Sequence, residues 1–369
     1  MRLRAFLVFA LATLLVWAAP LAGLVVAGRD PSAYLAFPPR TEYVAHQPFA
    51  WGMFVVFALP AAAATALYWA ALMRARAVPA ATRGGRFPWW GWVGLALLAL
   101  GWILAWYEGI VPPAWRRHTF TPLWIGYIVA MNAVVYRSSG RCLMTHRTGW
   151  FLALFPVSAL FWWLFEYLNQ FVDNWYYTGI RARGDWDYFL QATAPFATVL
   201  PAVASTWAWL RRHPLLEAVS LPAVRAHRGF GWVALFAGIA TLGAIGIWPE
   251  GLFSLLWLAP LLLLCGLQQL LVGETFLAPL ARADWRPLLQ PMLAALLCGL
   301  LWELWNYGSA AKWHYSIPYV QRFHVFEMPI LGYAGYLPFG LECAVVMDLV
   351  ARLVERRALW PLDSGGPGE

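Results

Sequence analysis

Ten apolar runs alternate with short polar or charged segments along the chain. A helix needs about 20 mostly apolar residues to cross a membrane, and most of the runs have about this length. They cover residues 5–27, 49–72, 88–107, 122–137, 150–172, 188–210, 230–248, 251–272, 288–308 and 329–350. The fourth run is short, and only Pro249-Glu250 separates the seventh from the eighth. The pattern predicts an all-α polytopic membrane protein of about ten transmembrane helices.

The first apolar run also resembles a secretory signal peptide, because it follows the basic residues Arg2 and Arg4. No small-x-small cleavage site precedes a soluble domain, however. We therefore expect residues 5–27 to be an uncleaved first span.

Composition makes lipid the main solvent of this chain. Apolar residues are 62% of the 369 residues and charged residues only 12%, whereas a soluble domain has about 25% charged residues. The net charge of +8 comes from arginines in short loops between the apolar runs, which is how membrane topology uses positive charge. No soluble domain of this chain carries a basic stripe, so we exclude a nucleic-acid partner. We expect the lipid bilayer to be the main partner.

The positive-inside rule supports ten spans. With the N-terminus in the cytoplasm, the inner segments hold 18 of the 26 basic residues. These are Arg2, Arg4, Arg74, Arg76, Arg83, Arg86, Arg137, Arg141, Arg147, Arg211, Arg212, Arg225, Arg228, Arg282, Arg286, Arg352, Arg356 and Arg357. No outer segment holds more than two. The rule predicts both termini in the cytoplasm, and the arginine-rich loops favour a bacterial inner membrane.

Two segments of the chain resemble each other. Both have Glu-x-x-Asn followed by Trp-x-Tyr nine or ten residues after the glutamate. The matching residues are Glu166, Asn169, Trp175 and Tyr177 in the first segment, and Glu303, Asn306, Trp313 and Tyr315 in the second. Further pairs keep nearly the same offset, among them Gly91-Trp92 with Gly231-Trp232 and Pro195-Phe196 with Pro338-Phe339. The sequence thus predicts a tandem repeat of four-helix units.

The repeat divides the chain into four parts. They are a two-span segment (1–87), a first four-helix unit (88–229), a second unit (230–350) and a cytoplasmic tail (351–369). Four spans leave both units in the same orientation, so we expect an axis along the membrane normal to relate them.

Carboxylates inside the apolar runs are the first functional candidates, since burying one in lipid costs at least about 2.5–3.5 kcal/mol. Glu166, Glu303 and Glu342 are the clear cases, and Asp348 lies nearer the cytoplasmic end. Because residues three apart share a helix face, Asn306 can hold Glu303 or a shared ligand. We predict Glu303, Glu342 and Asn306 as catalytic residues.

Aromatic residues next to these carboxylates complete the predicted site. Most of the 25 tryptophans are explained by the aromatic belts at the membrane surfaces. The predicted substrate-binding residues are Trp302, Trp305, Trp313, Tyr315, Glu166 and Asn169. Aromatic faces beside a carboxylate suit a cation, either a ligand ammonium or a carbocation.

A structural role competes with this interpretation, because Glu-Asn pairs also join helices by hydrogen bonds in lipid, each worth about 0.6–2 kcal/mol. The difference between the units favours function in the second, since Glu342 aligns with Val199 in the first.

We predict neither a metal nor a cofactor. His324, Glu327 and His314 share one outer loop, but they lack a helical His-Glu-x-x-His frame. The four cysteines have no CxxC spacing, which argues against a zinc site and a disulfide framework. The chain also has no P-loop, no strand-linked GxGxxG and no GxSxG elbow.

Three motifs follow one another in the second unit: Trp302-Glu303, Trp313-His314-Tyr315 and Leu337-Pro338-Phe339-Gly340-Leu341-Glu342. They are an acidic residue late in one helix, a Trp-x-aromatic segment, and then a Leu-Pro helix start followed by a glutamate. In these motifs the second unit resembles the membrane lycopene cyclase domains and related carotenoid-modifying membrane proteins. The cyclases carry Glu-Glu after that proline, where this chain has Leu341-Glu342. The resemblance implies an apolar, isoprenoid-like substrate.

Three functions remain open at this point. The first is an enzyme that acts on a lipid or isoprenoid by acid/base chemistry. The second is a proton-coupled transporter, to which parallel repeats and mid-membrane carboxylates are also suited, although no matching pair of Gly/Pro-broken helices is visible in the sequence. The third is a non-catalytic membrane subunit or assembly factor. The sequence predicts no oligomeric state.

Overall fold

The computed structural model describes residues 1–75, 84–227 and 229–362. Most of these residues are helical, which confirms the predicted helical class. The positions of Arg76, Arg83 and Arg228, and the predicted tail from residue 363 onward, lie outside the described residues.

Six helices in the described part of the chain are long and apolar enough to cross a membrane. They are α1 (Arg2–Val26), α2 (Trp51–Arg74), α3 (Trp89–Trp106), α7 (Thr148–Val172), α11 (Phe230–Ile247) and α14 (Arg286–Tyr307). The segments Pro249–Trp257 and Ala259–Val272 form a seventh if they are taken as one span, and they meet at a bend of 49°. The first segment contains α12 (Pro249–Leu252), and the second begins with α13 (Ala259–Leu267).

The other three predicted spans coincide with shorter or more polar elements. They are α5 (Phe120–Ser139), the pair α8 (Asp185–Phe196) and α9 (Val199–Leu210), and α15 (Tyr336–Val354). Helix α15 carries Glu342, Asp348 and Arg352, all buried within the protein. The predicted sixth span is therefore two 12-residue helices rather than one.

The remaining elements are short. They comprise α4 (Pro113–Arg116), α6 (Leu143–His146), α10 (Pro214–Glu217), the 3₁₀ segments Ser32–Leu35, Ala278–Arg282 and Ile330–Gly335, and the strands β1 (Trp175–Thr178), β2 (Lys312–Tyr315), β3 (His324–Val325) and β4 (Met328–Pro329). Strand β1 pairs antiparallel with β2, and β3 with β4.

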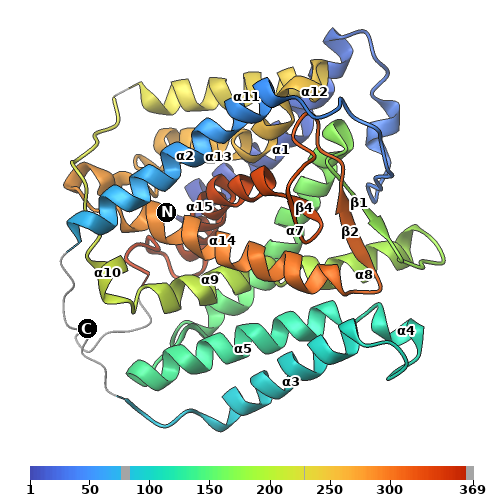
Figure 1. Cartoon of the computed structure of the whole chain (residues 1–369). Coiled ribbons are helices and arrows are strands. Elements are labelled where there is room, and N and C mark those ends of the chain that lie inside the picture. Colours follow the sequence, from blue (N-terminus) through green and yellow to red (C-terminus); the bar gives the residue numbers. More distant parts are fainter. Residues whose placement is uncertain (76–83, 228, 363–369) are drawn as a thin grey trace.

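The helices form a bundle with α7, α9, α14 and α15 near its centre (Figure 1). Helix α3 packs on α5 along one side, and α11 packs on α13 and α1 toward the other. More than half of the most apolar window of α7 and of α14 is buried, whereas only 6% of that of α2 is buried. The exposed apolar surface of α2 therefore needs lipid around it.

Glycines allow two of these helix pairs to approach closely. A Cβ on Gly126 of α5 would lie 2.5 Å from the backbone nitrogen of Leu98 on α3. A Cβ on Gly266 of α13 would lie 2.6 Å from the backbone nitrogen of Leu235 on α11. Close backbone approach at small residues is how helices pack in lipid, where no hydrophobic effect drives them together.

Candidate functional site

The paired strands β1 and β2 lie at one end of the bundle, and each follows a central helix (Figure 1). Helix α7 leads into β1 and α14 into β2. The register places Trp175 opposite Tyr315 and Tyr177 opposite Trp313. The two Trp-x-Tyr segments that the sequence singled out are therefore hydrogen-bonded neighbours.

Two asparagines fix the start of these strands. The side-chain oxygen of Asn169 accepts hydrogen bonds from the backbone N–H groups of Asn174 and Trp175, and its amide donates to the Trp175 carbonyl at 2.7 Å. Asn306 accepts from the Trp313 N–H at 2.9 Å and donates to the Trp313 carbonyl at 2.8 Å. Both amides therefore bond to strand backbone and not to the glutamate three residues earlier.

Glu166 is held by three aromatic donors. Its Oε1 accepts hydrogen bonds from Trp162 Nε1 at 2.8 Å, Trp175 Nε1 at 3.1 Å and the hydroxyl of Tyr177 at 2.5 Å. The residue is only 2% exposed. Burial and the neighbouring Glu166 keep the pKa of Tyr177 well above its usual range, so its hydroxyl stays protonated and donates.

Glu303 has a corresponding set of donors. Its Oε1 accepts from the hydroxyls of Tyr315 at 2.7 Å and Tyr336 at 3.2 Å, and from Trp313 Nε1 at 3.3 Å. Burial and the adjacent Glu303 likewise keep the pKa of Tyr315 well above its usual range. Glu303 is fully buried, and its Oε2 has no hydrogen-bond partner among the described residues.

Tyr336 reaches Glu303 because Gly299 leaves room for its ring. A Cβ on Gly299 would lie 2.3 Å from Cε2 of Tyr336. Gly299 lies on α14, one helical turn before Glu303, and Tyr336 is the first residue of α15. The contact between these two helices thus positions one of the three donors.

A cavity of about 150 Å³ lies next to both carboxylates. Eleven of its 23 lining residues are Phe, Trp or Tyr, and they include donors to both glutamates. The lining residues are Arg117, His118, Phe120, Trp162, Trp175, Tyr177, Ile180, Tyr188, Gln191, Ala192, Pro195, Phe196, Val199, Trp257, Trp302, Ala311, Lys312, Trp313, Tyr315, Met328, Gly332, Gly335 and Tyr336. The two glutamates lie behind their donors and are not part of the lining. A ligand in this cavity would meet indoles and phenols first.

The predicted eighth span consists of two segments that meet at a bend, and its Trp257 contributes to the cavity wall. Trp257, at the bend before α13, stacks on Trp175 with ring centres 5.7 Å apart and on Phe165 at 5.2 Å. Its indole also lies near Gly335, just before α15. The bend thus places an aromatic side chain against Phe165 of α7 and Trp175 of β1.

The structure separates Glu342 from this cavity. Its Oε1 accepts from the backbone N–H of Leu261 near the start of α13 at 3.2 Å. Its Oε2 has no partner among the described residues, and the side chain is fully buried. No described hydrogen bond joins Glu342 to Glu303, so the predicted centre of Glu303, Asn306 and Glu342 is not one connected site.

The predicted aromatic residues also divide into two groups. Trp302, Trp313 and Tyr315 line the cavity. Trp305 does not, because it is buried against Trp124 and Trp102 at ring distances of 4.8 and 5.9 Å. Tyr177, Tyr336 and Trp257 also line the cavity, although they are not among the predicted site residues. The Trp-x-Tyr repeat could have identified Tyr177, but Trp257 and Tyr336 carry no comparable local signal.

Both carboxylate oxygens of Asp348 are hydrogen-bonded within the protein. One of its carboxylate oxygens accepts from Gln268 at 2.6 Å and from Arg352 at 2.7 Å, and the other accepts from the backbone N–H of Leu359 at 2.7 Å. A buried polar group that is fully hydrogen-bonded stabilises a fold, whereas unsatisfied groups are the ones that need another explanation. Glu303 and Glu342 each have one carboxylate oxygen without a hydrogen-bond partner among the described residues, so they need such an explanation.

Glu327, in the loop between α14 and α15, pairs with two basic side chains of β2. Glu327 pairs with Lys312 at 2.6 Å and with His314 at 3.2 Å. Burial alone would raise the pKa of Glu327, but these two partners together hold it below its usual value. Within the described part of the chain, no group of three or more His, Cys, Asp or Glu residues is arranged to hold a metal.

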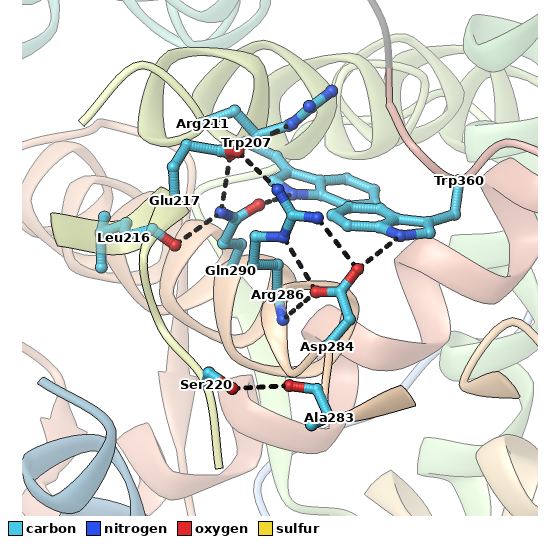
Figure 2. Close-up of polar contacts among 10 residues, drawn as sticks. All are labelled: Trp207, Arg211, Leu216, Glu217, Ser220, Ala283, Asp284, Arg286, Gln290 and Trp360. Atoms are coloured by element: carbon cyan, nitrogen blue, oxygen red, sulfur yellow. Dashed lines mark hydrogen bonds and ion pairs between the residues drawn. The ribbon is translucent and has the colours of Figure 1, made fainter. Parts of the chain in front are cut away.

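A second polar cluster lies away from the cavity, around α10 and the start of α14 (Figure 2). Arg286 bridges Asp284 at 2.8 Å and Glu217 at 2.9 Å. Trp360 stacks on Trp207 at 6.0 Å, with ring planes 10° apart, and donates to Asp284 at 3.1 Å. Since its charges pair with one another, the cluster fastens the chain after α15 to α9 and α14.

We compared the chain with protein-family models, curated proteins and solved structures, and none of these comparisons finds a match.

Proposed function

We propose that this chain is a membrane-embedded enzyme that binds a lipid or isoprenoid in the aromatic cavity and acts on it by proton transfer. The observation that carries the proposal is the pair of glutamate–tyrosine hydrogen bonds at the cavity wall, Tyr177 to Glu166 and Tyr315 to Glu303. Each phenol reaches the cavity while its carboxyl group lies behind it.

Two such pairs can both deliver and remove a proton. Adding a proton at one carbon of an alkene and removing one from another carbon moves the double bond, and this needs neither oxidant nor cofactor. The intermediate is a carbocation, which the faces of Trp162 and Trp302 would stabilise. General acid/base catalysis of this kind contributes about 10²–10⁴-fold to a rate.

The isoprenoid substrate class rests on the resemblance to the membrane lycopene cyclase domains. Trp302, Trp313 and Tyr315 of the resembling segment are residues of the cavity wall. The many aromatic residues of the lining also suit an apolar substrate.

We extend the proposal to ten spans in two parallel four-helix units, with both termini on the cytoplasmic side of a bacterial inner membrane. The corresponding donors of Glu166 and Glu303, and the corresponding contacts of Gly126 and Gly266, support the repeat. The cavity would then lie toward the outer face.

The proposal is tested by mass spectrometry of lipid extracts from cells that make the intact chain or the Glu303→Gln variant at equal membrane abundance. A lipid that changes mass or double-bond position only with the intact chain is the expected result. Glu42→Gln is the matched control, because Glu42 is exposed and lies outside the cavity. Identical extracts from the intact chain and Glu303→Gln, with both proteins folded, would contradict the enzyme.

A proton-coupled transporter is the second candidate, and one observation favours it. The bend of 49° before α13 lies close to Leu261, whose N–H binds the buried Glu342. Broken helices beside an intramembrane carboxylate are typical of transporters. Proton-coupled flux in proteoliposomes that is abolished by Glu342→Gln but not by Glu303→Gln would favour this function over the enzyme. A non-catalytic subunit would show neither lipid modification nor proton-coupled flux.

A further inference from the structure

Among the described residues, the wall of the cavity carries positive and no negative side chains. Its ionisable residues other than tyrosine are Arg117, His118 and Lys312, and no described aspartate or glutamate is part of the lining. Glu166 and Glu303 are shielded by the tryptophans and tyrosines that donate to them. The charge that a ligand would meet is therefore positive.

Arg117 has no counter-ion among the described residues. Lys312 pairs with Glu327 at 2.6 Å, and the neighbouring Arg116 pairs with Glu108 at 2.9 Å. The side chain of Arg117 makes no ion pair or hydrogen bond with any described residue, although it is half-buried. A partly buried charge is normally paired, so Arg117 is suited to an anion from outside the chain.

The surroundings of Arg117 leave space for such an anion. Arg117 and His118 also line a neighbouring hollow together with Thr121 and Gln191. The nearby Asp187, which interacts electrostatically with His118, accepts hydrogen bonds from Gln191 and from the Arg183 N–H at 2.9 Å each. Asp187 is therefore bonded to partners other than Arg117.

The same cavity has an apolar part. Trp162, Phe196, Val199 and Trp302 belong to the lining and offer hydrocarbon and aromatic surface. An apolar wall with a cation in the same lining matches an amphiphile that has a hydrocarbon chain and an anionic head.

We propose that the cavity binds an isoprenoid lipid phosphate, with the phosphate on Arg117 and the hydrocarbon chain against Trp162 and Trp302. A guanidinium can bind phosphate oxygens through two parallel N–H donors, which favours arginine at such sites. This inference rests on the proposed function and specifies the chemical class of its ligand.

The test measures binding of three probes to the purified full chain in nanodiscs: farnesyl phosphate, farnesol and inorganic phosphate. We expect farnesyl phosphate to bind at least tenfold more tightly than farnesol, and inorganic phosphate not to compete at equal concentration. Arg117→Gln should remove the advantage of farnesyl phosphate while leaving the affinity for farnesol unchanged, which also shows that the variant is folded. Arg181→Gln is the matched control, because Arg181 is exposed and is not part of the lining.

Other outcomes would overturn the inference in distinguishable ways. Equal binding of farnesol and farnesyl phosphate would remove the phosphate from the proposal and leave the proposed function intact. Competition by inorganic phosphate as strong as that by farnesyl phosphate would identify a site for free anions. Failure of both prenyl probes to bind would contradict the lipid cavity itself, and with it the proposed function.

Discussion

The phenol of Tyr315 donates a hydrogen bond of 2.7 Å to Oε1 of Glu303, and it does so from a strand that a different residue, Asn306, holds in place. The carboxyl group is buried while the phenol reaches the cavity. A proton leaving or reaching a ligand would therefore pass through the tyrosine hydroxyl.

Removing that hydroxyl should abolish most of the activity without disturbing the fold. We expect Tyr315→Phe to lower turnover of the lipid substrate by about 10²-fold or more, in the range of general acid/base catalysis, because phenylalanine keeps the ring but loses the proton path. Turnover per folded protein is the measurement. Tyr307→Phe is the matched control, since Tyr307 is exposed and outside the cavity. Full activity of Tyr315→Phe would show that the hydroxyl has no role in proton transfer.

Gly299 should control the position of a second donor. We expect Gly299→Ala to displace the Tyr336 ring, because the new Cβ would lie 2.3 Å from it, and to lower turnover by about tenfold, a smaller effect than loss of a proton-transferring group. The Gly299→Ala/Tyr336→Phe double variant tests the mechanism. If Gly299 acts through the Tyr336 hydroxyl, the double variant should be no slower than Tyr336→Phe alone. Additive losses would contradict this coupling.

The sequence predicted much of this region because its signals are local. Glu303 lies on a helix, and the Trp-x-Tyr segment that follows supplies two of its three donors. The third donor, Tyr336, comes from another helix through a contact at Gly299. Helix spacing shows that Asn306 shares a face with Glu303, but the path of the chain after the helix decides which partner the amide binds.

The span count shows a similar limit. Hydropathy predicts α2 and α3 as spans from their apolar content alone, and most of the most apolar window of each helix is exposed on the protein surface. Helix α15 is more polar than α2 and α3 because it contains Glu342, Asp348 and Arg352. These side chains are buried against other parts of the protein. Apolar content alone cannot show which side of a helix faces lipid. It also did not predict the 49° bend before α13.

Asn306 should contribute to stability rather than to chemistry. We expect Asn306→Ala to lower the free energy of unfolding by about 2–4 kcal/mol, because two hydrogen bonds to the Trp313 backbone are lost in a buried place. Asn306→Asp should lose less, since it retains the acceptor for the Trp313 N–H. Thermal unfolding in detergent measures both. An Asn306→Ala variant with wild-type stability and no activity would instead support the predicted catalytic role.

The pair of Arg147 and Glu355, at the ends of α7 and α15, should make stability depend on acid pH. Burial raises the pKa of Glu355, but the hydrogen bonds and charge of Arg147 outweigh it, so the folded-state pKa is below the ordinary value. The stabilisation is therefore present above the unfolded-state pKa of about 4.3 and is lost as the pH falls through the folded-state pKa.

The matched variant for this pair is Glu355→Gln. We expect it to lower stability by about 1.5–3 kcal/mol at pH 7, as for a hydrogen bond to a charged group, and to lower it by progressively less as the pH falls below the unfolded-state pKa of about 4.3. Unfolding midpoints between pH 3 and 7 check this. Equal losses of stability at pH 3 and pH 7 would mean that the carboxylate charge of Glu355 does not cause the stabilisation.

The proposed proton transfer is tested most directly by solvent deuterium. Purified protein is incubated in D₂O with a lipid extract from its host membrane, and the lipids are then analysed by mass spectrometry. The account predicts carbon-bound deuterium, resistant to back-exchange in H₂O, in one lipid class with the intact chain and with Glu42→Gln, and its absence with Glu303→Gln. A folded, intact chain that incorporates no deuterium into any lipid, or one that does so equally after Glu303→Gln, would contradict proton transfer at this site.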